Sequence, residues 1–176
     1  NSCAPGVNPN LNPVNNRVQT QSNPNAIRPA TRKVAARVEQ LIDVKRMEGY
    51  LAALTGKTAF LPNTVIPERG TVKGRALTRQ FLSNTLESLG YKVEMHEYRK
   101  NGINVMARLM ADEPTDEYIV VGAHMDSVSN AGGDDNGSGS TAVLEIASIM
   151  PQLQGRKANI LFAWFDEEEL GLIGSG

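Results

Sequence analysis

The sequence predicts an α/β fold in which helices pack on a mixed sheet with parallel strands at its centre. Two short apolar runs, residues 118–123 and 159–165, have the length of buried strands. A helical pattern from about residue 138 to 150 separates them. A strand, a helix and a strand in this order form a unit whose two strands are parallel. We therefore expect a three-layer α/β/α arrangement that is truncated after the second of these strands.

Two helices and a long loop are predicted before this unit. Apolar residues recur at helical spacing from Thr31 to about Gly56 and again over residues 75–89. Residues 57–70 between them contain two prolines and are expected to form a loop.

A hairpin is predicted to follow the second helix. Residues 91–99 and 103–110 alternate between polar and apolar side chains. The Asn101-Gly102 pair between them is typical of a type I′ turn.

The composition divides the chain into two parts. Residues 1–30 are rich in Asn, Pro, Gln and Ser and cannot bury enough apolar surface to offset their ordering entropy. We expect them to form a disordered tail or a pro-region remnant, and residues 31–176 to belong to one catalytic domain. Cys3 is the single cysteine, so no intrachain disulfide can form.

Charge and hydropathy exclude two classes of partner. The chain has 18 basic and 19 acidic residues and a formal net charge of −1. Proteins that bind nucleic acid or a membrane surface carry a basic excess, so we expect neither partner. No apolar run approaches the roughly 20 residues of a membrane span.

Three polar segments are expected to meet at one rim of the sheet. Residues 122–126 (GAHMD) lie at the end of the first apolar run, and residues 166–171 (DEEELG) directly follow the second. Residues 134–139 (DDNGSG) lead into the helix between the two runs. Ligands bind at the carboxyl ends of strands in such sheets. Carboxylates with one imidazole suit a divalent metal, so the sequence predicts a metal site.

His124 is the imidazole of this site. A lone histidine is more often structural, but Asp126 lies two positions further, at the spacing of a neighbour on the same strand face. A carboxylate there would accept the second imidazole N–H and orient the ring for metal binding. These observations favour His124 as a metal ligand.

The acidic residues each have a simpler alternative. Asp134 and Asp135 suit the start of a helix, although Ser138 is the more natural cap. The run 166–169 resembles a solvated charge cluster, but it directly follows a buried strand. Acids there lose hydration and repel one another unless a cation compensates them. We therefore expect a metal to compensate one acid and a neighbouring acid to act as a general base.

A calcium-binding loop is the alternative from another class of function. Asp134, Asn136, Ser138 and Gly139, with Glu145 at the twelfth position, have the spacing of an EF-hand. An EF-hand also needs a helix before its first ligand, and here a strand and two glycines precede it.

The three motifs, in this order and spacing, resemble those of the leucyl-aminopeptidase-like zinc peptidases, which include secreted bacterial aminopeptidases with a two-zinc site. The resemblance covers residues 31–176. It implies that His124 binds one Zn²⁺, that Asp135 bridges both ions and that Glu169 binds the second. It also implies that Asp126 orients His124 and that Glu168 is the general base.

The resemblance further implies a cis peptide bond between Asp135 and Asn136. Family members have two more ligands, an aspartate and a histidine, downstream of the paired glutamates. Because the sequence ends at Gly176, we expect a fragment or one chain of a cleaved enzyme, inactive without the remaining C-terminal part. The implied substrates are peptide or protein N-termini, and the implied location is secreted or periplasmic.

Two other functions remain open for this fold. Glutaminyl-cyclase-like acyltransferases share it and use a single zinc. A non-catalytic domain could also keep the fold for protein binding, although the intact set of His124, Asp135, Glu168 and Glu169 argues against this.

Overall fold

The computed structural model describes residues 37–176, so the predictions for residues 1–30 and for a helix beginning at Thr31 lie partly or wholly outside it. After a helical segment at residues 37–41, the described helices are α2 (Val44–Leu54), α3 (Val72–Ser88) and α4 (Gly139–Ile149). The strands are β1 (Val93–Arg99), β2 (Gly102–Leu109), β3 (Tyr118–His124) and β4 (Asn159–Phe165). Short helical turns occur at Met150–Gln152 and Ile173–Ser175, and Gly133–Ser138 forms an irregular turn with non-helical backbone angles at Asp135 and Asn136. None of the helices described is long and apolar enough to cross a membrane.

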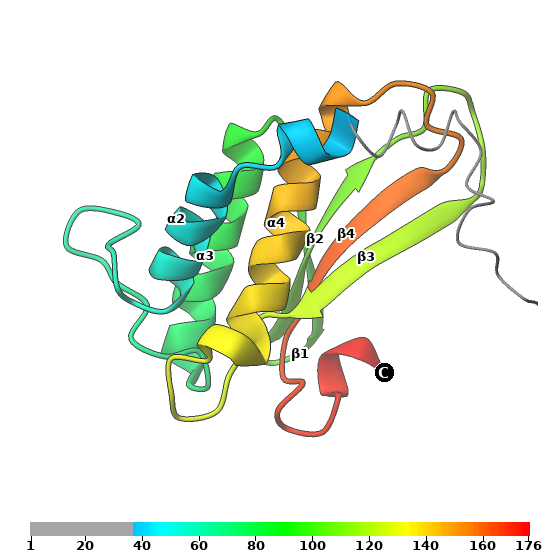
Figure 1. The fold of residues 1–176 in the computed structure, drawn as a ribbon. Coiled ribbons are helices and arrows are strands. Elements are labelled where there is room, and N and C mark those ends of the chain that lie inside the picture. The colour runs from blue at the N-terminus through cyan, green and yellow to red at the C-terminus, as the bar shows by residue number, and fades with distance from the viewer. Residues whose placement is uncertain (1–36) are drawn as a thin grey trace, which may run out of the picture. The chain divides into compact units, whose positions relative to one another are not determined.

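The four strands form one mixed sheet in the order β1-β2-β4-β3. Strands β3 and β4 are parallel, and the other two pairs are antiparallel. Helices α2, α3 and α4 lie on one side of this sheet (Figure 1). The α/β class and the parallel pair around α4 are therefore confirmed, and the described residues supply two of the three expected layers.

The hydrophobic core lies between the sheet and these helices. Alternate residues of β4, Ile160, Phe162 and Trp164, point into it, as the period of two along a strand requires. The Phe162 ring meets that of Tyr91 edge to face, with centroids 5.7 Å apart. The helices contribute large apolar side chains, among them Leu54, Phe81, Leu82, Leu86 and Leu144.

Strand β3 differs from its prediction. Its apolar sequence predicts burial on both faces, but Tyr118, Ile119 and Val120 are 47–58% exposed. The reason is position, because β3 is the edge strand of the described sheet and the helices of residues 37–176 cover one face only.

The hairpin turn also differs from its prediction. Asn101 has a φ of 66°, but Gly102 is not in the left-handed region and instead opens β2 opposite Arg99. The type I′ turn, which needs two left-handed residues, is therefore wrong. The glycine is needed for space: a Cβ at 102 would lie 2.6 Å from the Tyr98 ring and 2.8 Å from Oε2 of Glu167.

Helix α4 is capped by a different residue than predicted. Ser138 makes no capping hydrogen bond, and its hydroxyl instead donates to the carbonyl oxygen of Asp134. The Asn136 side chain accepts the N–H of Gly139 at 2.9 Å and so satisfies one free donor at this end.

The calcium-loop alternative is excluded by the surroundings of Glu145. This residue is buried on α4, and its carboxylate accepts hydrogen bonds from the Arg46 guanidinium and from the N–H of Asp43 at 2.7–2.8 Å. Its oxygens are therefore committed to helix α2 and cannot complete an EF-hand site.

We expect Phe162→Ala to lower the free energy of unfolding by about 3–5 kcal/mol, because it leaves a cavity where Tyr91 and the helices meet the sheet. Urea denaturation measures this loss. Val44→Ala, at a side chain that is 63% exposed, is the control and should change stability by less than about 0.5 kcal/mol. Equal effects of the two substitutions would contradict this placement of the core.

Candidate metal centre

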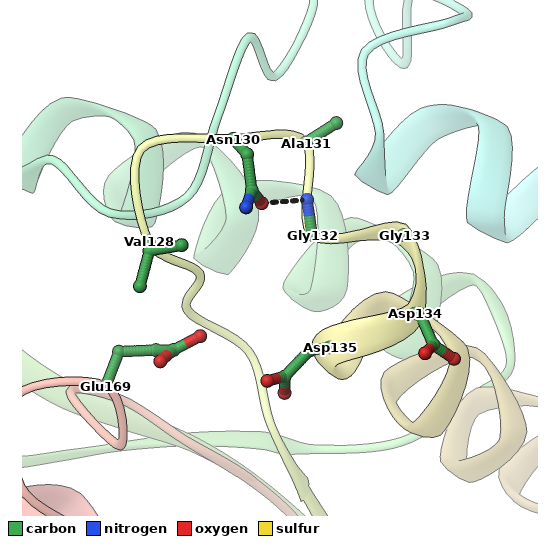
Figure 2. A pocket seen from close by; sticks show the side chains of 8 residues that line it. All are labelled: Val128, Asn130, Ala131, Gly132, Gly133, Asp134, Asp135 and Glu169. Carbon is green, nitrogen blue, oxygen red and sulfur yellow. Dashed lines mark hydrogen bonds between the residues drawn. The ribbon is translucent and has the colours of Figure 1, made fainter.

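Three predicted ligands from separate segments meet beyond the ends of β3 and β4. His124 is the last residue of β3, Asp135 lies in the turn before α4, and Glu169 follows β4. One potential ligand atom from each lies within 4.8 Å of the others. Figure 2 shows the carboxylates of Asp135 and Glu169 facing one another, whereas Asp134 points away. The structure thus brings together the metal ligands that the sequence predicts.

The His124 ring lies between two carboxylates. Its Nε2 is 2.9 Å from Oδ1 of Asp135 and 3.7 Å from Oε2 of Glu168. Its Nδ1 is buried, has no hydrogen bond of good geometry, and lies 3.3 Å from Oδ1 of Asp126. An imidazole with a carboxylate behind it and carboxylates in front of it has the surroundings of a metal-binding histidine.

Asp126 does more than the sequence analysis assigned to it. Its buried carboxylate accepts the backbone N–H groups of Glu168 and Glu169, both at 3.1 Å. Asp126 therefore connects the end of β3 to the segment after β4, and it faces His124 from the same position.

The donor set fits a divalent metal. One imidazole and two carboxylates are ligands that Zn²⁺ takes in catalytic sites. The Asp135 side chain is 76% exposed, so the ligands are open to a metal and a substrate. A cavity of about 540 Å³ adjoins them and is lined by Val128, Asn130, Ala131, Gly132, Gly133, Asp134, Asp135 and Glu169 (Figure 2).

The loop that carries Asp135 is folded on itself. Gly132 has a φ of 52°, and its N–H donates to the Asn130 side chain at 2.7 Å (Figure 2). Its carbonyl oxygen accepts the N–H of Gly137. The peptide bond between Asp135 and Asn136 is cis, as the family resemblance implied.

Arg69, which the sequence analysis missed, holds this loop by hydrogen bonds to its backbone. It is fully buried, and its guanidinium donates only to backbone carbonyl oxygens. These belong to Leu54, Met125, Ala131 and Gly132, at distances of 2.5–2.9 Å. Burial lowers the pKa of the guanidinium, an effect opposed first by Asp126 and then by Asp135 and Glu169. Arg69 thereby joins helix α2, the end of β3 and the loop that carries Asp135.

The acidic run after β4 is divided into two pairs. Asp166 and Glu167 are buried, whereas Glu168 and Glu169 lie near His124. The sequence predicted a metal for one acid of this run and no cation for the others, whereas the first pair has cations from the protein itself.

Three arginines compensate the buried pair. Arg75 and Arg79 of α3 lie 2.9 and 3.1 Å from the carboxylate oxygens of Asp166. Arg75 and Arg99 lie 3.0 and 2.7 Å from those of Glu167. Burial raises the pKa of the Asp166 carboxyl, whereas the hydrogen bond from Arg99 lowers that of Glu167. Arg75 and Arg79 are four positions apart on one helix, where two like charges repel each other. This spacing in the sequence could have indicated that acidic residues lie opposite them.

Comparison with known sequences agrees with the predicted resemblance. Residues 104–176 match peptidase family M28. The chain is 31% identical over 156 residues to leucine aminopeptidase 1 of Paracoccidioides brasiliensis (strain Pb03), a match that covers 80% of this chain and 40% of that protein. It is 38% identical over 101 residues to leupeptin-inactivating enzyme 1 of Streptomyces exfoliatus, covering 54% and 23% respectively. The expected resemblance to leucyl-aminopeptidase-like peptidases is confirmed.

Solved structures share the fold. The LapA aminopeptidase of Legionella pneumophila superposes with a TM-score of 0.70 at 22% identity, over 85% of this chain and 39% of that one. A glutaminyl cyclase of Macrostomum lignano superposes with a TM-score of 0.58 at 19% identity, over 74% and 40%. The chain thus spans about 40% of the length of these proteins and of leucine aminopeptidase 1.

We expect Arg69→Met to lower the free energy of unfolding by about 3–5 kcal/mol, because four backbone carbonyl oxygens, three of them on buried residues, lose their donor. Chemical denaturation provides the measurement. Arg108→Met, which removes an exposed ion pair with Glu94, is the matched control and should cost under about 1 kcal/mol. A loss at Arg69 no larger than that of the control would show that the loop does not depend on this side chain.

Proposed function

From the premise that residues 104–176 carry the sequence of peptidase family M28, we propose that this chain is the N-terminal part of a metal-dependent aminopeptidase. The observation that carries the proposal is the meeting of His124, Asp135 and Glu169 within 4.8 Å, with Glu168 beside them. The aminopeptidase names of the relatives support hydrolysis of N-terminal peptide bonds.

The proposed metal is zinc, with two ions in the complete site. His124, Asp135 and Glu169 would hold it, because they provide the imidazole and carboxylate donors that zinc prefers. When bound, such a metal lowers the pKa of a water and polarises the substrate carbonyl. Two further ligands would come from the C-terminal part of the domain, and without them we expect the chain to be inactive. The proposed location is secreted or periplasmic.

Glu168 is the proposed general base. Its carboxylate lies 3.7 Å from His124 and belongs to the pair of the acidic run that is not held by arginines. It would take the proton of the attacking water and pass it to the leaving amine. Asp126 would support both the base and the metal ligand, because its carboxylate accepts the N–H of Glu168 and faces the His124 ring.

A glutaminyl-cyclase-like acyltransferase is the second candidate, since such cyclases share this fold. The two functions differ in product. We expect the full-length protein to hydrolyse leucine p-nitroanilide in the presence of Zn²⁺ and to leave an N-terminal glutaminyl peptide uncyclised. Absorbance follows the first reaction, and mass spectrometry detects the 17 Da loss of ammonia in the second. Cyclisation without hydrolysis would replace the aminopeptidase proposal with the alternative.

Glu168→Gln in the full-length protein should lower kcat by about 10²–10⁴-fold, because the substitution removes the proton acceptor. Its zinc content should stay at the wild-type level, since the proposed ligands are unchanged. Asp135→Ala is the contrasting variant and should lose zinc together with activity. Metal analysis and steady-state kinetics of the same samples separate the two effects. Near-normal turnover of Glu168→Gln would disprove the base assignment.

A further inference from the structure

The backbone between the end of β4 and the proposed base turns sharply at Glu167. This residue has a φ of 59°, in the left-handed region that side chains other than glycine rarely adopt. The turn sends Asp166 and Glu167 toward α3 and the hairpin, and the following residues Glu168 and Glu169 toward His124. Because the conformation is intrinsically disfavoured, other interactions must hold it.

The Glu167 carboxylate makes three of those interactions. Its oxygens accept hydrogen bonds from Nη2 of Arg75 at 3.0 Å, Nε of Arg99 at 2.7 Å and Oη of Tyr98 at 2.9 Å. Glu167 and Arg75 are both buried, so water screens the contact between them weakly, whereas the Arg99 side chain is 47% exposed. Gly102 leaves room for the carboxylate, since a Cβ there would lie 2.8 Å from Oε2.

On the far side of the turn, a single side chain accepts the next two N–H groups, while the carbonyl oxygens of Glu167 and Glu168 accept N–H groups from residues 171–173. The N–H groups of Glu168 and Glu169 both donate to the Asp126 carboxylate. The segment is thus fixed by one anion before the proposed base and by another after it. If Glu167 loses its partners, the left-handed turn loses the side-chain contacts that oppose its strain and keeps only backbone hydrogen bonds. We then expect the N–H groups of Glu168 and Glu169 to move away from Asp126.

We propose that Glu167 is a positioning residue that sets the place of Glu168 through the backbone turn. The inference rests on the proposed function, in which Glu168 is the base. Glu167 itself touches neither the candidate ligands nor the cavity beside them. If Glu167 only formed a structural ion pair, its removal would lower the stability of the whole protein. It would not selectively change the position of Glu168 or kcat.

The test compares Glu167→Gln and Tyr98→Phe with Tyr91→Phe in the full-length protein. Glu167→Gln replaces the carboxylate with a neutral amide whose NH₂ group cannot accept from an arginine. Tyr98→Phe removes one donor to Glu167 and leaves its charge. Tyr91→Phe is the matched control, because it also removes a tyrosine hydrogen bond, here a buried one to the carbonyl oxygen of Ala147. The measurements are amide hydrogen exchange by NMR, zinc content, kcat and KM.

We expect the amides of Glu168 and Glu169 to exchange at least tenfold faster in Glu167→Gln than in wild type. In the same variant kcat should fall at least tenfold, with KM within threefold and zinc retained. Tyr98→Phe should show smaller changes of the same kind in amide exchange and kcat. If Glu167→Gln does not fold, Tyr98→Phe tests the positioning role of Glu167. Tyr91→Phe should change neither kcat nor these two amides.

Unchanged exchange at Glu168 and Glu169, or an unchanged kcat, would overturn the positioning role. A general loss of exchange protection equal to that of Tyr91→Phe would likewise reduce Glu167 to a structural ion pair. Absence of hydrolysis by the wild-type protein would refute the proposed function instead. The exchange rates would then still decide whether Glu167 holds the segment.

Discussion

The parallel register of β3 and β4 is the constraint on which the rest of the site depends. His124 pairs opposite Phe165, so the histidine that ends one strand and the acidic run that follows the other emerge at the same edge. Helix α4 returns the chain between the two strands, and the turn before it, Gly133–Ser138, brings Asp135 to that edge. The three candidate ligands therefore meet because of strand pairing, even though 45 positions separate the first from the last.

Charge is distributed around this edge in two ways. Asp166 and Glu167 are neutralised by arginines of α3 and β1, which permits their burial. Asp135, Glu168 and Glu169 have no arginine within salt-bridge distance among the described residues, and they surround the His124 ring instead. The protein thus supplies cations for the acids that shape the backbone and leaves free the acids that the proposed chemistry needs.

Local signals predicted most of this architecture. Helix and strand periodicity placed α3, the hairpin, β3, α4 and β4, and the polar residues at the strand ends identified His124, Asp135 and Glu169 as neighbours. Long-range pairing was not predictable in this way. Arg69 reaches carbonyl groups more than 50 positions away, and Arg75 pairs with Glu167 across 92 positions, so neither has a local signature. The exposure of β3 depends on its place at the sheet edge, which an apolar run does not encode.

Strand β3 has a practical consequence for anyone who prepares this part of the chain. Within the described residues its outer backbone edge has no partner strand, and Tyr118, Ile119 and Val120 are exposed beside it. An unprotected apolar edge is a template for strand addition from another molecule. A recombinant piece limited to residues 37–176 should therefore self-associate as its concentration rises, and charged or proline substitutions along this edge offer a way to keep it monomeric.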